Sequence, residues 1–324
     1  MNIQKQNNAQ KEALSFIQNN VPLNNKNWFQ TGGESRFYCE PRTVVEFQSA
    51  LMFARTNSLP IFMLGKGANV LISDSGFPGL TIRPQLVEAM YHVTNNQHLV
   101  TAGSGMDFDD LINYCLNHQL SGLEEFSGIP STVGGATYIN LHYYEFLLSD
   151  FFVEGVIINK ETGEIKTVSK EWFNFGYDQS TLQEKAWFLV SATFNLKPIS
   201  AEETAYARGR AVEIKRHRYK RYPHTHTCGS FFRNFSPEEV ENSSKKLIYV
   251  AYYLDKLGLK GELSFGDAII SHQHANMIVN RGNATTTDIL NLTLDMQKRV
   301  HEAFGIVPLP ECQLIGFTEN PFEK

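Results

Sequence analysis

The chain is organised around the stretch Leu64-Gly65-Lys66-Gly67-Ala68-Asn69-Val70-Leu71-Ile72-Ser73. The apolar residues just before it, 60–64, and those near its end, 70–72, are typical of short buried strands. Small residues between two strands let backbone N–H groups approach a bound group closely, and consecutive N–H groups form an anion-binding concavity. A strand and not a helix follows the glycines, so the pattern is neither a Walker loop nor a Rossmann motif. Taken alone, such a turn is more often an ordinary hairpin.

A second segment of small residues changes that interpretation. It reads Gly128-Ile129-Pro130-Ser131-Thr132-Val133-Gly134-Gly135-Ala136-Thr137-Tyr138-Ile139-Asn140. Together with the first stretch, which continues to Gly76-Phe77-Pro78-Gly79, it resembles the FAD-binding domain of the UDP-N-acetylenolpyruvoylglucosamine reductase (MurB) family. The family patterns read close to LGxGSNxLxxDxGFxG and GIPGTVGGAxxxN. The resemblance extends from about Thr31 to Gly316, which is nearly the whole chain.

The resemblance implies a cofactor and a way of holding it. In the family, both segments wrap the pyrophosphate of FAD with backbone amides, and NADPH reduces the FAD. The residues to which it assigns cofactor binding in this chain are Leu64, Gly65, Lys66, Gly67, Ala68, Asn69 and Val70 in the first segment, and Gly128, Ile129, Pro130, Thr132, Val133, Gly134, Gly135 and Ala136 in the second.

A motif near residue 230 resembles the part of the family that protonates the substrate. A serine hydroxyl has little acidity by itself and needs an activating environment, and most Gly-Ser pairs are ordinary turns. By resemblance, however, Ser230 protonates a carbon of the reduced substrate, while Arg233 and Asn234 bind the substrate. The family pattern is (A/C)GSxFKN, and this chain reads Cys228-Gly229-Ser230-Phe231-Phe232-Arg233-Asn234.

Two further motifs extend the resemblance toward the C-terminus. Residues 308–316 are similar to the family ending LxPEVxxIG, which implies that Glu311 assists the protonation and stabilises the intermediate. A glutamate at a strand end is otherwise most often simply exposed. His274, in a segment that resembles a KHA-like motif, is assigned to substrate binding. Two histidines two residues apart without a neighbouring carboxylate give little support to a metal site, and we expect none.

Two places depart from the family pattern, and both belong to the active site by resemblance. The first is Asp178, which occupies the position of an Arg that stabilises charge on the intermediate. The family reads FGYRxS there, and this chain reads Phe175-Gly176-Tyr177-Asp178-Gln179-Ser180. The second follows Asn140, where the family reads NAGAYG and this chain reads Asn140-Leu141-His142-Tyr143-Tyr144-Glu145-Phe146. Both departures concern the substrate and leave the FAD-binding segments intact.

Composition restricts the class of protein. The chain has 324 residues, of which 42% are hydrophobic and 19% charged, a balance typical of globular proteins. Its net charge of −5 gives no indication of a nucleic-acid surface. The four cysteines form no CxxC pair, which suits a reducing compartment. No signal-peptide core or membrane-spanning run is apparent. We therefore expect a cytoplasmic protein that binds neither nucleic acid nor membrane. A monomer is a separate expectation that composition does not decide.

Periodicity and punctuation predict an α+β or α/β chain of two domains. The resemblance implies that residues 1–199 form a two-subdomain FAD-binding domain of the vanillyl-alcohol-oxidase/MurB type, divided into about 25–85 and 86–199. Residues 200–324 are expected to form an α/β substrate domain. Helices are predicted after Thr43 and from Asp107, at 201–220, at about 246–257, and at about 287–304 with Thr287 and Gly305 as caps. A hairpin is predicted at 153–168.

The resemblance implies an NADPH-driven, FAD-dependent reduction of UDP-N-acetylglucosamine enolpyruvate to UDP-N-acetylmuramate, a step of peptidoglycan precursor synthesis. Asp178 leaves two alternatives open. One is a paralogous flavin oxidoreductase that acts on another nucleotide sugar. The other is a non-catalytic protein that binds FAD or a nucleotide sugar.

Overall fold

The computed structural model describes residues 15–241, 243 and 245–323. Their packing divides them into two compact units. Unit 1 contains residues 15–19, 37–66 and 79–216, and unit 2 contains residues 20–36, 67–78 and 217–323. The chain therefore passes between the two units several times. A single boundary at residue 199, as predicted, does not include these crossings. That division into 1–199 and 200–324 stays a prediction about domains.

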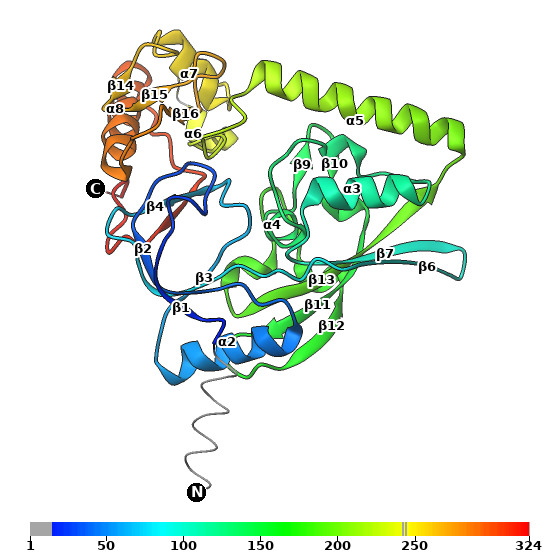
Figure 1. The fold of residues 1–324 in the computed structure, drawn as a ribbon. Helices are drawn as coiled ribbons and strands as arrows, with labels where there is room; N and C mark the ends of the chain where they lie inside the picture. The colour runs from blue at the N-terminus through cyan, green and yellow to red at the C-terminus, as the bar shows by residue number, and fades with distance from the viewer. Residues whose placement is uncertain (1–14, 242, 244, 324) are drawn as a thin grey trace, which may run out of the picture. The chain divides into compact units, whose positions relative to one another are not determined.

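Unit 1 is built on an antiparallel sheet with the strand order β12-β11-β13-β7-β6, and β8 pairs with one end of β13 (Figure 1). The hairpin predicted at 153–168 is confirmed, because β11 and β12 pair in register from Glu154↔Ser169 to Ile158↔Ile165. The strands are β6 (Ala89–Thr94), β7 (Gln97–Gly103), β8 (Leu120–Ser121), β11 (Phe152–Asn159), β12 (Ile165–Ser169) and β13 (Trp187–Pro198).

Helices cover both faces of this sheet (Figure 1). On one face, the buried side of α2 packs with β13, where Phe47 stacks on Phe188 at 6.4 Å between ring centroids. On the other face, α3 and α4 share a core with Phe194 of the same strand. β13 supplies both cores because its register shifts by one residue at Val190, so that Phe188 and Phe194, six residues apart, lie on opposite faces. The helices are α2 (Val44–Thr56), α3 (Phe108–Asn117) and α4 (Val133–Tyr138).

Local signals in the sequence define where the first helices begin. The Thr43 hydroxyl accepts a hydrogen bond from Glu46 N, as predicted, and the Glu46 carboxylate accepts one from Arg42 N. The Asp107 carboxylate accepts from Asp109 N and begins α3. Each of these bonds satisfies an N–H group that the helix leaves without a partner. The predicted helix starts after Thr43 and at Asp107 are therefore confirmed.

The remaining elements of the first 221 residues are short, apart from the last helix. A four-stranded sheet has the order β1-β2-β5-β3, and β9 and β10 form a hairpin. Their bounds are β1 (Gln18–Pro22), β2 (Glu34–Cys39), β3 (Ile61–Met63), β5 (Phe77–Ile82), β9 (His142–Tyr143), β10 (Phe146–Leu147), the 3-10 helices Glu124–Phe126, Leu148–Asp150, Lys170–Phe173 and Thr181–Glu184, and α5 (Ala201–Arg221).

The two strands that flank the first glycine-rich stretch do not form a hairpin. β3 pairs in parallel with β5 in the four-stranded sheet. β4 (Val70–Ile72) pairs in parallel with β17 (Gln313–Ile315), near the end of the chain. The stretch is therefore a connection between two different sheets, and the interpretation as an ordinary hairpin is wrong.

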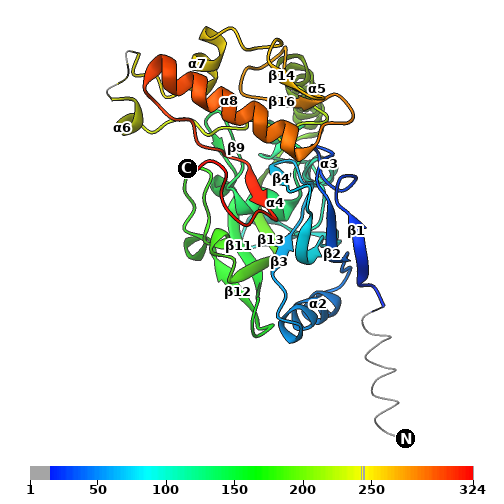
Figure 2. The ribbon, with the colours of Figure 1, turned by 90° about the vertical axis from the view of Figure 1, so that its left-hand side faces the viewer.

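Unit 2 combines this parallel pair with a three-stranded antiparallel sheet of order β14-β15-β16. α8 packs on β14, β15 and α7, and Figure 2 shows it as a long helix beside them. Its core includes Phe231, Phe232, Tyr253 and Met296, all almost fully buried. The elements are α6 (Pro237–Val240), α7 (Val250–Lys256), β14 (Ser264–Phe265), β15 (Ala268–Ile270), β16 (Ile278–Asn280) and α8 (Thr286–Phe304).

The helix predicted to begin at about Lys246 begins four positions later, at Val250. The reason is the buried Tyr253 side chain, which binds the backbone of Leu247 in place of a helical turn. Its hydroxyl donates to Leu247 O at 2.8 Å and accepts from Leu247 N at 3.2 Å. A side chain from inside the helix thus satisfies backbone groups that precede it.

The start of α8 is held by two caps, neither of them the predicted Thr287. Thr285 is the N-cap residue and its hydroxyl accepts from Asp288 N, while Gly305 ends the helix as predicted. Asp74 supplies a second cap from the loop after β4. Its carboxylate accepts from Thr286 N at 2.8 Å, from Thr287 N at 2.9 Å and from the Thr287 hydroxyl at 2.9 Å. An anion at a helix N-terminus is also stabilised by the helix dipole.

We expect Asp74→Ala to lower the free energy of unfolding by about 1–3 kcal/mol, because it removes both a cap and a favourable charge. Asp74→Asn should cost less, since an amide oxygen can still accept. The measurement is chemical denaturation of both variants. Asp295→Asn is the matched control, because it breaks only a surface ion pair with Arg299 on the same helix and should change stability by less than about 1 kcal/mol. Equal stability of Asp74→Ala and the wild type would contradict the second cap.

Candidate active site

The first glycine-rich stretch presents a row of backbone donors. Within the part of the chain that the structure describes, the backbone N–H groups of residues 65–69 donate no hydrogen bond to the protein. Gly67 has a left-handed backbone with φ of +67°, which suits glycine. Buried or half-buried N–H groups need partners, and a row of them is a ready site for an anion.

The second segment, 128–136, is partly helical. Gly128 has a φ of +79°, and α4 begins right after Thr132. The Thr132 hydroxyl accepts from Gly135 N at 3.1 Å. Gly134 N donates to Ser104 O at 2.8 Å, so the segment lies directly against the turn that follows β7. A β-carbon on Gly134 would lie 3.0 Å from that same oxygen, which leaves no room for a side chain.

Within unit 1 the two segments touch each other. A β-carbon on Gly65 would lie 2.8 Å from the Thr132 hydroxyl, so only glycine allows this approach. The Lys66 ammonium forms an ion pair with Asp107, the N-cap residue of α3. Asp107 is in turn bridged through its backbone to Thr132. The first turn of α3 thus links the predicted cofactor-binding residues of both segments.

Three buried polar atoms near these segments have no hydrogen-bond partner among the described residues. They are Asn69 Oδ1 in the first segment, Ser127 Oγ directly before the second, and Ser104 Oγ beneath Gly134. Buried polar groups normally have partners, and a bound molecule with polar groups would supply them. In unit 1, Ser104 Oγ and Ser127 Oγ could bind polar groups of a cofactor such as FAD, and the N–H row at 65–69 by itself suits a diphosphate. Ser104 and Ser127 were not predicted, because an isolated serine carries no sequence signal.

Unit 2 brings three predicted motifs together. Glu311 N donates to Phe231 O at 2.8 Å, which sets the Glu311 segment beside the Ser230 segment. On the other side, Ser230 forms an antiparallel β-bridge with Met277. The Asn276 side chain accepts a hydrogen bond from Phe232 N at 3.0 Å and donates one to Phe232 O at 2.7 Å. Asn276 was not predicted. A single asparagine beside a motif carries no sequence signal that marks it.

His274 is held in its neutral form. Burial is the main cause that lowers the pKa of its imidazole to about 4; the charges of Arg221 and Lys260 contribute in the same direction, and Asp255 opposes them. Its ring meets Tyr222 edge to face at 5.4 Å, and its Nδ1 atom has no hydrogen-bond partner in the described residues. At neutral pH this histidine offers a hydrogen bond and no charge. Any contact with an anionic substrate would therefore be through a neutral ring.

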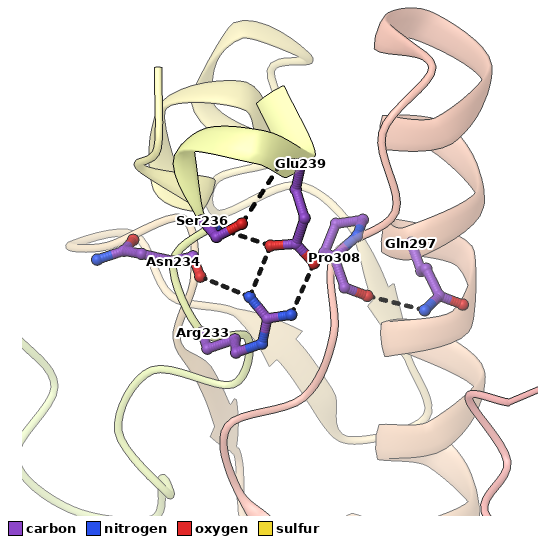
Figure 3. A network of polar contacts seen from close by, with 6 residues as sticks. All are labelled: Arg233, Asn234, Ser236, Glu239, Gln297 and Pro308. Carbon is purple, nitrogen blue, oxygen red and sulfur yellow. Dashed lines mark hydrogen bonds and ion pairs between the residues drawn. The ribbon is translucent and has the colours of Figure 1, made fainter. Parts of the chain in front are cut away.

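The predicted substrate-binding residue Arg233 is engaged by a neighbouring carboxylate (Figure 3). Its guanidinium forms two hydrogen bonds with Glu239, at 2.7 Å and 2.8 Å, and donates to Asn234 O at 3.0 Å. The pair raises the pKa of Arg233 and lowers that of Glu239. Glu239 also accepts from Ser236 N and so belongs to the cap of α6. The charge of Arg233 is balanced within unit 2.

Asp178 and the altered segment after Asn140 lie side by side in unit 1. His142 Nδ1 lies 3.2 Å from Asp178 Oδ1, and the His142 ring lies 4.5 Å from that of Tyr177. Asn140 Nδ2 also donates to Gly176 O at 2.9 Å. The two departures from the family pattern are therefore one connected structural change, in which a histidine accompanies the unusual carboxylate.

Metal ligands do not gather in the described ranges, where no group of three or more His, Cys, Asp or Glu side chains could hold an ion. All four cysteines are buried and free. The described helices include none that is both long and apolar enough to cross a bilayer.

Two family models match the chain. Residues 35–169 match the FAD binding domain, and residues 221–315 match the C-terminal domain of UDP-N-acetylenolpyruvoylglucosamine reductase. The predicted fold class, an FAD-binding domain followed by a substrate domain of this type, is confirmed by these matches.

Relatives with the same name are similar over most of their length. The Synechococcus sp. protein named UDP-N-acetylenolpyruvoylglucosamine reductase is 33% identical over 94% of this chain and 93% of its own. The Lactobacillus acidophilus protein of that name is 31% identical over 95% and 98%. The crystal structure of the Thermus caldophilus enzyme (MurB) superposes with a TM-score of 0.73 at 27% identity, covering 93% of this chain and all of that one. The chain belongs to the UDP-N-acetylenolpyruvoylglucosamine reductase family, and it is an FAD-dependent oxidoreductase of that family.

Proposed function

We propose that the protein uses NADPH and FAD to reduce UDP-N-acetylglucosamine enolpyruvate to UDP-N-acetylmuramate. The observation that carries the proposal is the full-length similarity to relatives named for this reaction. The arrangement of unit 2 supports it, since the Ser230, His274 and Glu311 segments are hydrogen-bonded neighbours. When bound, FAD supplies the redox chemistry, carrying a hydride equivalent from the nicotinamide to the enolpyruvyl double bond.

The chain's own residues bind, orient and protonate. The N–H groups of residues 65–69 and the segment 128–136 would hold the diphosphate of FAD. Ser230 would give a proton to the carbon next to the one that receives hydride, and Glu311 would assist it. Asn234, His274 and Arg233 would contact the nucleotide sugar, with Arg233 oriented by Glu239.

We further propose that the protein acts as a monomer in the cytoplasm. Its soluble nucleotide cofactor and nucleotide-sugar substrate belong to that compartment. Its four thiols are unpaired, as in a reducing environment.

The purified protein should be yellow, with a flavin absorbance spectrum, and should release FAD on heating. Under anaerobic conditions NADPH should bleach the flavin, and UDP-N-acetylglucosamine enolpyruvate should restore the colour. Bleaching without recovery would favour a flavin oxidoreductase with another nucleotide sugar as substrate. FAD binding without bleaching would favour the non-catalytic alternative, and a colourless protein that cannot be reconstituted with FAD would contradict the whole proposal.

A further inference from the structure

We propose that Asp109 is a positioning residue for the cofactor, which fixes the second segment at Gly128 and is itself held by Lys215 of α5. The proposal rests on the proposed function, because it concerns the binding of FAD. It adds residues that neither glycine-rich segment contains.

Asp109 uses its two oxygens on two different partners. Oδ1 accepts a hydrogen bond from Gly128 N at 3.0 Å, and Oδ2 lies 3.1 Å from the Lys215 ammonium. The N–H of Gly128 is thereby held at the point where the chain turns with a φ of +79° into the second segment. A carboxylate bond to that N–H fixes the direction in which residues 129–136 leave the turn.

Lys215 contributes packing as well as charge. A β-carbon on Gly128 would lie 3.0 Å from Lys215 Cγ, so the aliphatic part of the lysine lies directly over the glycine. Lysine stems commonly cover apolar surface while the ammonium group reaches a polar partner. Gly128 is thus held from two directions, by the carboxylate of Asp109 through its N–H and by the stem of Lys215 over its α-carbon.

The first turn of α3 also carries a carboxylate–lysine pair that reaches the first segment. Asp107 pairs with Lys66 and also accepts from Asp109 N at 2.9 Å, so the two aspartates are hydrogen-bonded to each other. Each carboxylate has its own lysine. An anionic cofactor can therefore approach this turn without meeting uncompensated negative charge, which would repel its diphosphate.

The two contacts of Asp109 are expected to contribute differently to FAD binding. Both side chains of the Asp109–Lys215 pair are about one third exposed, at 31% and 33%, so water screens their mutual attraction. The hydrogen bond from Gly128 N to a charged acceptor is the stronger contribution, and its loss corresponds to about a 10- to 100-fold change in an equilibrium constant. Loss of the Asp109 oxygen that accepts from Gly128 N should therefore weaken FAD binding more than loss of the Lys215 charge.

The test is titration of the apoprotein with FAD, followed by quenching of flavin fluorescence, together with hydrogen exchange of the peptide that contains residues 126–134. Asp109→Ala should weaken FAD binding by about 10- to 100-fold and speed exchange of this peptide. Asp109→Asn keeps an acceptor for Gly128 N and should bind FAD within a few-fold of the wild type. Lys215→Met keeps the aliphatic stem and should have a similarly small effect.

Arg210→Met is the matched control. Arg210 also joins α5 to another part of unit 1, but its two hydrogen bonds of 2.9 Å go to Glu125 and not to Asp109. It should change neither FAD affinity nor exchange at 126–134. Wild-type FAD affinity and exchange in Asp109→Ala would overturn the positioning role. So would equal losses in Asp109→Ala and Arg210→Met, since that would indicate a general loosening of α5. Failure of the wild type to bind FAD would instead overturn the proposed function.

Discussion

Replacing Ser230 by alanine is expected to slow reoxidation of the reduced flavin by substrate about 10²- to 10⁴-fold, the range typical of a lost general acid. Reduction of FAD by NADPH should be unchanged, because the serine acts only after hydride has left the nicotinamide. The fold should survive the change, since the segment is held through its backbone. Phe231 N donates to Asn276 O, and Glu311 N donates to Phe231 O, each at 2.8 Å.

Stopped-flow absorbance separates the two half-reactions of this experiment. Ser264→Ala, on the exposed strand β14, is the matched control and should leave both rates unchanged. Asn276→Ala should slow reoxidation as well, but it should also lower the melting temperature, because Asn276 is buried and bonded to the Phe232 backbone. Equal reoxidation rates in Ser230→Ala and the wild type would remove the proton-donor role.

Asp178→Arg is expected to raise the turnover of UDP-N-acetylglucosamine enolpyruvate, starting from a slow wild type. Hydride addition leaves negative charge on the carboxylate side of the substrate, and loss of one preorganised stabiliser of such charge typically costs about 10²–10³ in rate. A carboxylate in its place adds repulsion of up to about 4 kcal/mol at contact distance for an effective dielectric near 20. His142, at 3.2 Å, offsets part of this repulsion only when it is protonated.

Other arginines do not replace the missing charge without losing bonds of their own. Arg233 is bonded to Glu239, and Arg281 donates to Gly266 O at 2.8 Å. Asp178→Asn is the control for simple loss of the negative charge, and its gain should be smaller than that of Asp178→Arg. Combining Asp178→Arg with His142→Gly, the residue of the family pattern, should give the largest gain, because it restores the family residues at both positions of this connected change.

Steady-state kcat and the rate of flavin reoxidation measure this series. A wild-type kcat near the typical enzyme value of about 10 s⁻¹, with no gain from Asp178→Arg, would show that the His142–Asp178 pair does not limit the reaction. It would also show that this chain performs the family reaction with a different distribution of charge.

The parts of the fold that were predicted correctly depend on neighbours in the sequence. The starts of α2 and α3 follow from Thr43 and Asp107, whose side chains bond N–H groups two or three residues away. The hairpin at 153–168 follows from two apolar runs around a short turn. The partnership of β4 with β17 could not be predicted in this way, because nothing near residue 70 specifies residues 313–315.

The candidate site shows the same difference between contacts of sequence neighbours and contacts of distant residues. Residues inside recognisable motifs, such as Gly65 and Ser230, can be proposed as site residues from the sequence alone. Side chains that act through distant partners were missed, as with Asp109 on Gly128 and Glu239 on Arg233. The charge state of His274 could not be predicted from the sequence either, because its lowered pKa results mainly from burial in the folded unit.

The pairing of β4 with β17 has a consequence for the order in which the protein can be completed during synthesis. The ribosome releases residues 70–72 long before their strand partner, 313–315. Until then β4 is an unpaired edge with buried-type residues, the kind of surface that invites association with other chains. Contacts so distant in the chain also slow folding, because a long loop must close before they form. A nascent or truncated chain that lacks β17 therefore exposes the strand that follows the first glycine-rich stretch as an aggregation-prone edge.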